Sequence, residues 1–249
     1  MIAMLPMYDW PERRTDTDAR WAPLCAALRA EGFDAPNHLA RDENLAGMWL
    51  SPDLLIGETC SQPLATLLAG RVRYVATPVH DAPGCGQGTY RSVIVRRRPG
   101  ADLPPPESPA ASIPASAVTG RMAANEAGSM SGFVAPARDM NALGLAFLDE
   151  GDIVFTGSHR GSIQAVKAGE ADFAAIDCVT WQIALAHEPA ARELHIAGWT
   201  ASRPGLPLIT SLRYDDAAWE RIRRAVLASM PAVVLDPPID PARLPDPRP

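Results

Sequence analysis

Two short stretches of the sequence place hydroxyl groups and an imidazole where helices are expected to begin. The first is Ser129-Met130-Ser131-Gly132, within the segment NEAGSMSGF, and the second is Ser158-His159. A helix start presents unpaired backbone N–H groups and a partial positive charge, and serine and histidine side chains add further donors. Because Gly132 would let a ligand approach the backbone, the first stretch is a candidate seat for an oxyanion.

Each stretch also has a simpler interpretation. Ser131 can serve as an ordinary N-cap with Ser129 in a turn, and His159 can be a solvated residue in the first turn of its helix. The two stretches follow successive predicted strands, however, so they are expected to open toward the same edge of a sheet. This shared edge favours an anion site over two unrelated helix caps.

The apolar pattern predicts alternating strands and helices around these stretches. Strands are predicted at residues 2–6, 53–58, 72–79, 90–97, 118–125, 152–157, 171–178, 193–200 and 206–213. Helices are predicted at residues 18–33, 62–70, 131–148, 158–170, 179–188 and 215–230. Short apolar runs separated by helices are typical of an α/β protein with parallel strands, and their number suits two sheets better than one.

Further polar residues follow the predicted strands, at the sheet edge where open α/β proteins bind ligands. Tyr8 follows the first strand, Glu58 and Thr59 follow the second, and Asp177 follows the strand at 171–178. Asp177 can instead cap the helix that begins near Val179, and Glu58 is expected to be exposed at its strand end. Both alternatives remain open at this point.

Bulk composition narrows the class of protein. The chain has 249 residues and 47% hydrophobic residues, enough for a substantial core, and a formal net charge of -6. An acidic chain whose only basic run is Arg96-Arg97-Arg98 is a poor candidate for nucleic-acid binding. No apolar run approaches the roughly 20 residues that span a bilayer, and MIAMLPMYDW at the start predicts a strand rather than a signal peptide.

The sequence contains four cysteines, Cys25, Cys60, Cys85 and Cys178. None belongs to a C-x-x-C pair, so no zinc site is expected. No cofactor is expected either. Cys25 lies in a helical pattern and is predicted to be in the core. Cys60 and Cys85 each follow a strand-like run, and two alternatives stay open for them: a disulfide or two free thiols.

Several segments resemble one family. TGSHRGSIQAVKAGEADFAAIDCVTW (156–181) resembles the G-x-H-x-x-S-x-x-A-V-x-x-G-x-A-D-x-A-A-x-D segment of phosphate/phosphonate-type, PhnD-like substrate-binding proteins of ABC importers. NEAGSMSGF resembles the serine-rich anion loop of that family. GTYRSVIVRR resembles its entry to the second lobe, and RPGLPLIT resembles the return to the first. The resemblance covers most of residues 1–213.

The resemblance implies a type 2 periplasmic-binding fold, with two α/β lobes and a ligand cleft between them. The first lobe would comprise residues 1–88 and 200–249, and the second lobe residues 89–199. A Pro-rich segment at 99–116 is expected to be a surface loop, and the Pro-rich tail at 236–249 is expected to be extended.

The resemblance also implies roles for individual residues. Ser129, Ser131 and the N–H of Met130 would hold the oxyanion, with His159 assisting. Tyr90 matches a tyrosine of the family's cleft, and Asp177 lies near the family's acid for a ligand amine. The chain departs from the family after residues 53–58, where ETCSQP stands in place of a frequent tyrosine.

The function implied is capture of a small oxyanion, such as phosphate or a phosphonate, for an ABC importer without catalysis. The expected partners are the ligand and an ABC permease, and the chain is expected to be a monomer. A cytoplasmic ligand sensor and an enzyme of the pyrimidine-precursor type on the same fold are the alternatives. The resemblance implies a periplasmic location, and the start of the chain leaves a cytoplasmic one open.

Overall fold

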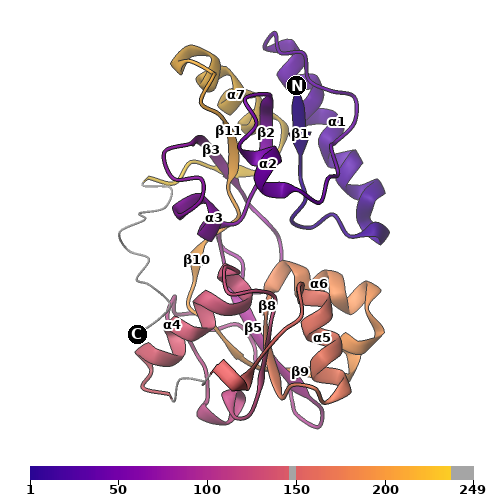
Figure 1. The fold of residues 1–249 in the computed structure, drawn as a ribbon, viewed down its shortest axis with the longest axis vertical. Coiled ribbons are helices and arrows are strands. Elements are labelled where there is room, and N and C mark those ends of the chain that lie inside the picture. The colour runs from indigo at the N-terminus through magenta and orange to yellow at the C-terminus, as the bar shows by residue number, and fades with distance from the viewer. Residues whose placement is uncertain (146–149, 237–249) are drawn as a thin grey trace. The chain divides into compact units, whose positions relative to one another are not determined.

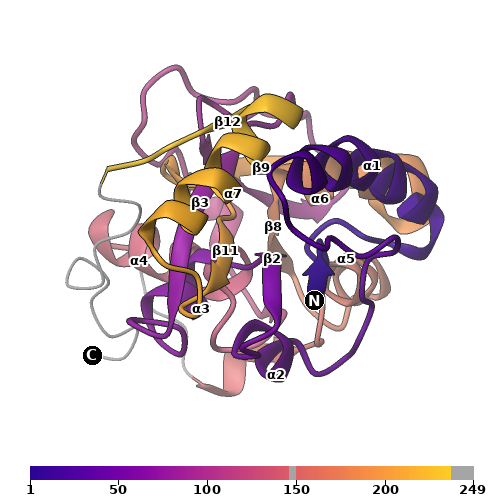
Figure 2. The ribbon, with the colours of Figure 1, turned by 90° about the horizontal axis from the view of Figure 1, so that it is seen from above.

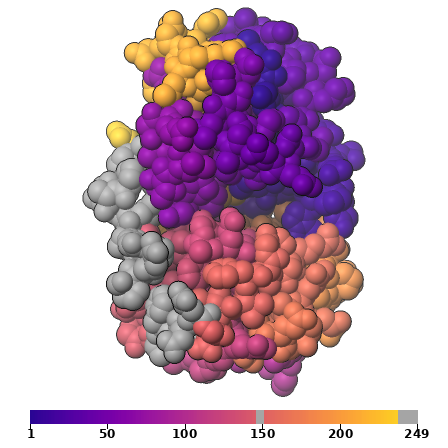
Figure 3. All heavy atoms as spheres, in the orientation of Figure 1, coloured from indigo at the N-terminus to yellow at the C-terminus, as the bar shows by residue number. Residues whose placement is uncertain are grey.

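The computed structural model describes residues 1–145 and 150–236, and they form two compact α/β units (Figure 1). Of the described residues, the first unit combines Met1–His80 with residues 204–236, and the second comprises Asp81–Arg203. In Figure 3 the indigo N-terminal residues and the gold residues of the segment that ends at 236 accordingly occur together in the first unit. These limits, at 80/81 and 203/204, differ from those expected at 88/89 and 199/200.

The first unit contains a five-stranded sheet with the order β1-β2-β11-β3-β12. Figure 2 shows β1, β2, β11 and β3 side by side in that order. The strands are β1 (Ile2–Met4), β2 (Leu54–Glu58), β3 (Val72–Pro78), β11 (Leu208–Ser211) and β12 (Ala232–Val233). The helices of this unit are η1 (Pro11–Arg13), α1 (Arg14–Ala30), α2 (Leu45–Trp49), α3 (Ser61–Ala65) and α7 (Asp216–Ser229).

The core of the first unit forms where α1 and α7 pack against the sheet. Trp21, Leu24 and Leu28 recur at helical spacing on α1 and share one buried cluster with Ile222 of α7. Cys25 belongs to the same cluster, as its helical pattern predicted. Burial of this apolar stripe stabilises both helices, because each gains more from packing than from its intrinsic helix propensity.

The second unit contains a five-stranded sheet with the order β7-β6-β8-β5-β9, and a two-stranded ribbon joins β4 to β10. The strands are β4 (Thr89–Tyr90), β5 (Ser92–Arg97), β6 (Met122–Ala124), β7 (Ile153–Phe155), β8 (Phe173–Asp177), β9 (Leu194–Trp199) and β10 (Arg203–Pro204). The helices are η2 (Ala115–Val118), η3 (Met130–Val134), α4 (Ala135–Ala142), η4 (Glu150–Asp152), α5 (His159–Ala168), α6 (Cys178–His187) and η5 (Pro189–Glu193).

The expectation of parallel strands was only partly right. β1 pairs in parallel with β2, and β6 pairs in parallel with both β7 and β8. β11, however, is antiparallel to β2 and β3, and β5 is antiparallel to β8 and β9. An apolar run indicates that a strand is buried, but it does not encode the direction of its neighbours.

Several predicted elements are shorter than expected. The Pro-rich segment also packs against the second unit more closely than the surface loop that was expected. The helix predicted at 131–148 ends at Ala142, while residues 146–148 of it, and 237–249 of the predicted tail, lie outside the described residues. The segment at 99–116 is not purely a surface loop, because Ile113 belongs to the core of the second unit. Backbone bonds tie it to β9: Leu103 N donates to Ile196 O at 2.9 Å.

The four cysteines are free, so the disulfide alternative for Cys60 and Cys85 is wrong. The Cys85 sulfur lies instead beside that of Cys178, at 3.5 Å. Within residues 1–145 and 150–236, no helix has the length and apolar character that crossing a membrane requires.

Truncating Leu28 should weaken the first unit strongly. Leu28 is 0% exposed in the α1–α7 core, so Leu28→Ala removes buried methyl groups and leaves a cavity, at a cost of about 2–5 kcal/mol. Leu212→Ala is the matched control, because Leu212 is 53% exposed and its truncation should change stability by less than about 0.5 kcal/mol. Urea unfolding monitored by tryptophan fluorescence measures both, and equal effects would contradict this description of the core.

Candidate functional site

The candidate residues of the second unit are positioned by the parallel pairing of β6, β7 and β8. Because these strands run in one direction, their carboxyl ends meet at the same sheet edge. Asn125 follows β6, Ser158 follows β7 by a short turn, and Asp177 ends β8. The turn after β7 is tied to the end of β6, since Gly157 N donates to Asn125 O at 2.9 Å.

Ser129 caps the helix that follows β6. Its Oγ accepts from Gly132 N at 3.1 Å, and its carbonyl accepts from Val134 N at 2.9 Å, which starts a π-helical turn that continues into α4. The interpretation with Ser131 as the cap and Ser129 in a turn was therefore wrong. Met130 and Ser131 occupy the first turn, where backbone N–H groups lack partners within the helix.

Gly132 is required by the packing of this loop. A Cβ atom at this position would lie 2.6 Å from Asn125 Oδ1 and 2.9 Å from Ser129 Oγ. The space beside Gly132 Cα is thus taken by these two side chains rather than open to a ligand. Asn125 stands at the end of the strand predicted at 118–125, but it was not assigned a role in binding. Its Oδ1 is buried without a hydrogen-bond partner among the described residues.

The structure joins the two stretches through a direct contact. Ser131 Oγ and His159 Nε2 are 2.8 Å apart, and the backbone N–H of Asp177 points to the same Nε2 at 3.5 Å. Residues from the ends of three strand–helix units therefore meet at one imidazole nitrogen.

Ser92 supports this contact from the neighbouring strand β5. The Ser92 hydroxyl donates to the carbonyl of Ser131 at 2.9 Å, and Ser92 N donates to Thr200 Oγ1 at 2.7 Å. The side chains of Ser92 and Thr200 are buried, so each of these hydrogen bonds satisfies polar groups that water does not reach. Sequence reasoning missed Ser92, because only the antiparallel register of β5 against β8 brings it here.

His159 is the first residue of α5, and Ser158 is its N-cap: Ser158 Oγ accepts from Gly161 N at 3.1 Å. Burial lowers the pKa of His159 to about 4, although the backbone of Ala175 acts in the opposite direction. The imidazole is therefore neutral at pH 7, and a neutral imidazole carries one N–H donor and one acceptor nitrogen.

Asp177 is buried and caps α6. Its Oδ1 accepts from Val179 N at 2.8 Å and from Thr180 N at 2.9 Å, as the capping alternative predicted. Tyr90 is also buried and lies in β4, two positions before Ser92 along the chain. Among the described residues, no group of three or more histidine, cysteine or acidic side chains is arranged to hold a metal ion.

The remaining candidates, Tyr8, Glu58 and Thr59, lie in the first unit. The ring of Tyr8 contacts His80 edge-on, with centroids 5.0 Å apart. Glu58 is not exposed as expected: it is 1% exposed, and its Oε2 accepts from Met7 N at 3.2 Å because the chain after β1 folds over the end of β2. Thr59 is 0% exposed, and its hydroxyl has no hydrogen-bond partner within the described part of the chain.

Comparison with known proteins gives matches of two kinds. The family model described as "ABC transporter, phosphonate, periplasmic substrate-binding protein" matches residues 56–235. No curated protein matches the chain. Solved structures match it at low identity, which supports a common fold.

PhnD1 from Prochlorococcus marinus in complex with methylphosphonate has a TM-score of 0.62 and 16% identity, over 91% of this chain and 83% of the other. A binding protein component of an ABC phosphonate transporter from Pseudomonas aeruginosa has a TM-score of 0.61 and 15% identity, over 90% and 72%. A Candida albicans protein described as having the generic periplasmic binding protein fold has a TM-score of 0.59 and 12% identity, over 92% and 69%.

These matches confirm the resemblance carried by the NEAGSMSGF and TGSHRGSIQAVKAGEADFAAIDCVTW segments, both of which lie within residues 56–235. They also confirm the predicted α/β fold as that of the periplasmic binding proteins. The chain belongs to the phosphonate-type periplasmic substrate-binding protein family of ABC transporters.

Proposed function

We propose that this chain captures a small oxyanion, phosphate or a phosphonate, at the site formed by Ser129, Met130, Ser131 and His159. The observation that carries the proposal is the contact of 2.8 Å between Ser131 Oγ and His159 Nε2, which joins two helix starts. Membership of the family implies a small ligand and an ABC permease as partners. The family is one of binding proteins rather than enzymes.

The Ser131 hydroxyl can donate to an anion only when its proton is free to point at it. If His159 carries its proton on Nε2, the imidazole donates to Ser131 Oγ, and the hydroxyl hydrogen is available for the ligand. If the proton is on Nδ1, Nε2 accepts from Ser131 and draws the hydroxyl away. The Asp177 N–H that points to Nε2 needs this nitrogen as an acceptor, which favours the form with the proton on Nδ1. An oxyanion therefore competes with His159 for the Ser131 hydroxyl proton.

The donors of the proposed site are neutral. His159 is uncharged at pH 7, because burial lowers its pKa to about 4. The backbone N–H groups of Met130 and Ser131 and the hydroxyl of Ser131 supply dipoles aimed from a helix start. Fixed neutral dipoles in a poorly hydrated setting bind an anion without the desolvation cost of a buried cation.

Gly132 contributes indirectly to the proposed site. Its N–H donates to Ser129 Oγ, and the absence of a side chain leaves room for Asn125. Tyr8, Glu58 and Thr59 are proposed to contact the ligand from the first unit. Support is strongest for Thr59, whose buried hydroxyl has no hydrogen-bond partner among the described residues. Tyr90 and Asp177 remain proposed ligand neighbours in the second unit, with the Asp177 carboxylate engaged in capping α6.

Replacement of Ser131 tests the site directly. Ser131→Ala removes one hydroxyl donor to a charged ligand, a loss of about 1.5–3 kcal/mol, so the affinity should fall about 10- to 100-fold. Isothermal titration calorimetry with inorganic phosphate and with methylphosphonate measures this loss.

Ser116→Ala is the matched control, since Ser116 is exposed elsewhere in the second unit. It should bind as tightly as the unaltered chain. An unchanged affinity for Ser131→Ala would remove Ser131 from the site, and no binding of either anion to the unaltered chain would reject the ligand class.

The neutral state of His159 predicts a pH dependence of stability. The folded-state pKa of about 4 lies below the ordinary histidine pKa of 6.5, so the unfolded chain binds a proton first as the pH falls. The contribution of the neutral His159 imidazole to the free energy of unfolding is fully present above pH 6.5. It decreases toward pH 4, by at most about 1.4 kcal/mol per pH unit. Burial lowers the pKa of His80 to about 4 as well, so His80 contributes a similar slope.

Urea unfolding of His159→Asn between pH 7 and pH 4.5 should show about half the loss of the unaltered chain, because His80 still titrates. His38→Asn, at an exposed position, should leave the loss unchanged. An NMR titration of the His159 ring should give a midpoint near 4. A midpoint near 6.5 would show that the surroundings of His159 do not disfavour the charged imidazole.

A further inference from the structure

Two cysteines that are far apart in the sequence are in contact within the second unit. Cys85 Sγ and Cys178 Sγ are 3.5 Å apart, although 93 positions separate the residues along the chain. Cys85 lies in the turn before β4, where its N–H donates to Ala82 O at 2.9 Å, and Cys178 begins α6, where its N–H donates to Arg91 O at 3.0 Å. Both sulfur atoms are therefore carried by backbone that is fixed by hydrogen bonds.

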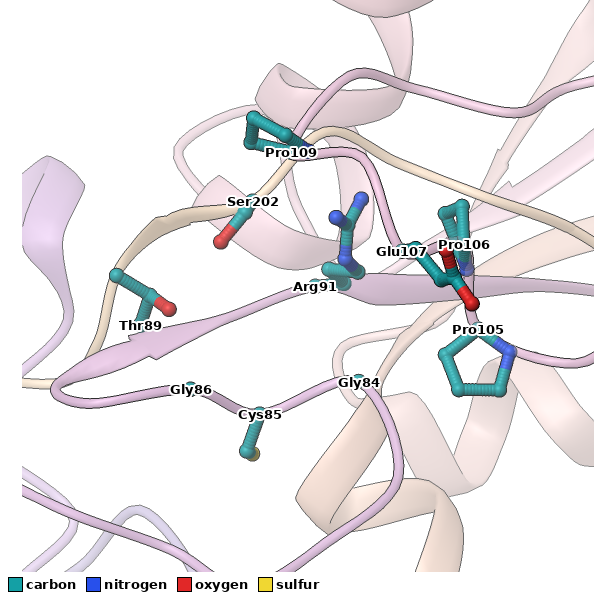
Figure 4. Close-up of a pocket in the computed structure, with 10 residues that line it drawn as sticks. All are labelled: Gly84, Cys85, Gly86, Thr89, Arg91, Pro105, Pro106, Glu107, Pro109 and Ser202. Carbon is teal, nitrogen blue, oxygen red and sulfur yellow. The ribbon is translucent and has the colours of Figure 1, made fainter.

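The two thiols differ in their access to solvent. Cys178 is 1% exposed, whereas Cys85 is half-buried. Cys85 also contributes to the wall of a pocket of about 330 Å³, together with Thr89, Arg91 and Ser202 (Figure 4). In that view the Cys85 side chain points away from Arg91. A small reagent can therefore reach Cys85 before Cys178.

The two thiols also differ in acidity. The hydrogen bond from the Cys178 S–H lowers the pKa of Cys85, while burial and the charges of Asp177 and Asp81 oppose this effect. The same hydrogen bond, with burial, raises the pKa of Cys178. The more accessible sulfur is thus also the one that becomes a thiolate more readily, and the thiolate is the reactive form.

We propose that Cys85 and Cys178 form a thiol–disulfide exchange site that reacts reversibly with small-molecule disulfides of the glutathione type. Cys85 is the attacking sulfur and Cys178 the resolving sulfur. The contact between them, and the difference in their exposure, assign these roles.

The reaction proceeds in two balanced steps. The Cys85 thiolate attacks one sulfur of the small disulfide, so that an S–S bond forms to Cys85, the original S–S bond breaks, and one small thiolate leaves. Cys178 then loses its proton to solvent and attacks Cys85 Sγ, which expels the second small thiolate. Both leaving thiolates take up protons, so the two cysteines are oxidised and the small disulfide is reduced to two thiols.

The short separation of the two sulfur atoms favours the second step. A disulfide requires the sulfur atoms to approach to about 2 Å, and Cys85 Sγ and Cys178 Sγ already lie 3.5 Å apart. The other cysteines differ: Cys25 lies in the core of the first unit and its Sγ donates to Pro36 O at 3.4 Å. Cys60 precedes α3 in the first unit and is the control position.

The test uses the purified full chain, fully reduced and then equilibrated with mixtures of reduced and oxidised glutathione. After acid quenching and alkylation, peptide mass spectrometry should show loss of two thiols and a peptide pair linked through Cys85 and Cys178. The rate should rise with pH, because the thiolate fraction of Cys85 rises. Retention of four free thiols, or linkage through Cys25 or Cys60 instead, would overturn the proposal.

Three single variants separate the two roles. Cys178→Ser should stop at a mixed disulfide of Cys85 with glutathione, and Cys85→Ser should form an adduct at Cys178 at least about 10-fold more slowly. Cys60→Ser should still form the Cys85–Cys178 link. Equal adduct rates at Cys85 and Cys178 would contradict the assignment of Cys85 as the attacking sulfur. Each readout is independent of anion binding, so failure of the proposed function leaves this result interpretable.

Discussion

The contact between Ser131 and His159 depends on the parallel pairing of β6, β7 and β8 in the second unit. The two residues are 28 positions apart in the sequence, and each stands at the start of a helix that leaves a different strand. Only when those strands end at one sheet edge can their helix starts approach to hydrogen-bond distance. The strand order of the sheet is therefore the constraint from which the proposed anion site follows.

Buried polar side chains hydrogen-bond to the backbone that carries Ser131 and to the first turn of α6. Ser92 holds the carbonyl of Ser131, and Asp177 holds the first turn of α6 while its own N–H points to His159. A buried polar group that loses its partner costs about 1–3 kcal/mol, so these bonds disfavour alternative positions of the loop. The donors of the proposed site are thus held by hydrogen bonds, which would reduce the ordering cost of binding.

The same sheet edge also explains why the thiols of Cys85 and Cys178 are in contact. Cys178 directly follows Asp177, so the end of β8 places one side chain at the cap of α6 and the next against Cys85. The turn that carries Cys85 precedes β4 and β5, and β5 is the antiparallel neighbour of β8. The antiparallel placement of β5 therefore determines both the Ser92 support and the thiol contact, and neither could be predicted from an apolar run.

The sequence by itself determined the alternation of strands and helices, because periodicity is a local property. It also placed Ser131 and His159 at the starts of helices that follow successive strands, and it offered Asp177 as one possible helix cap. It could not predict that Ser129 rather than Ser131 caps the helix, or that Glu58 is buried. Both outcomes depend on contacts with distant segments. Gly132 is an example: the sequence predicted its position in the loop, but it did not predict that the Asn125 side chain packs against it. Strand direction, the neighbours of Cys85 and the support from Ser92 were decided by the tertiary structure, since hydrogen-bond register between strands joins residues that no sequence spacing relates.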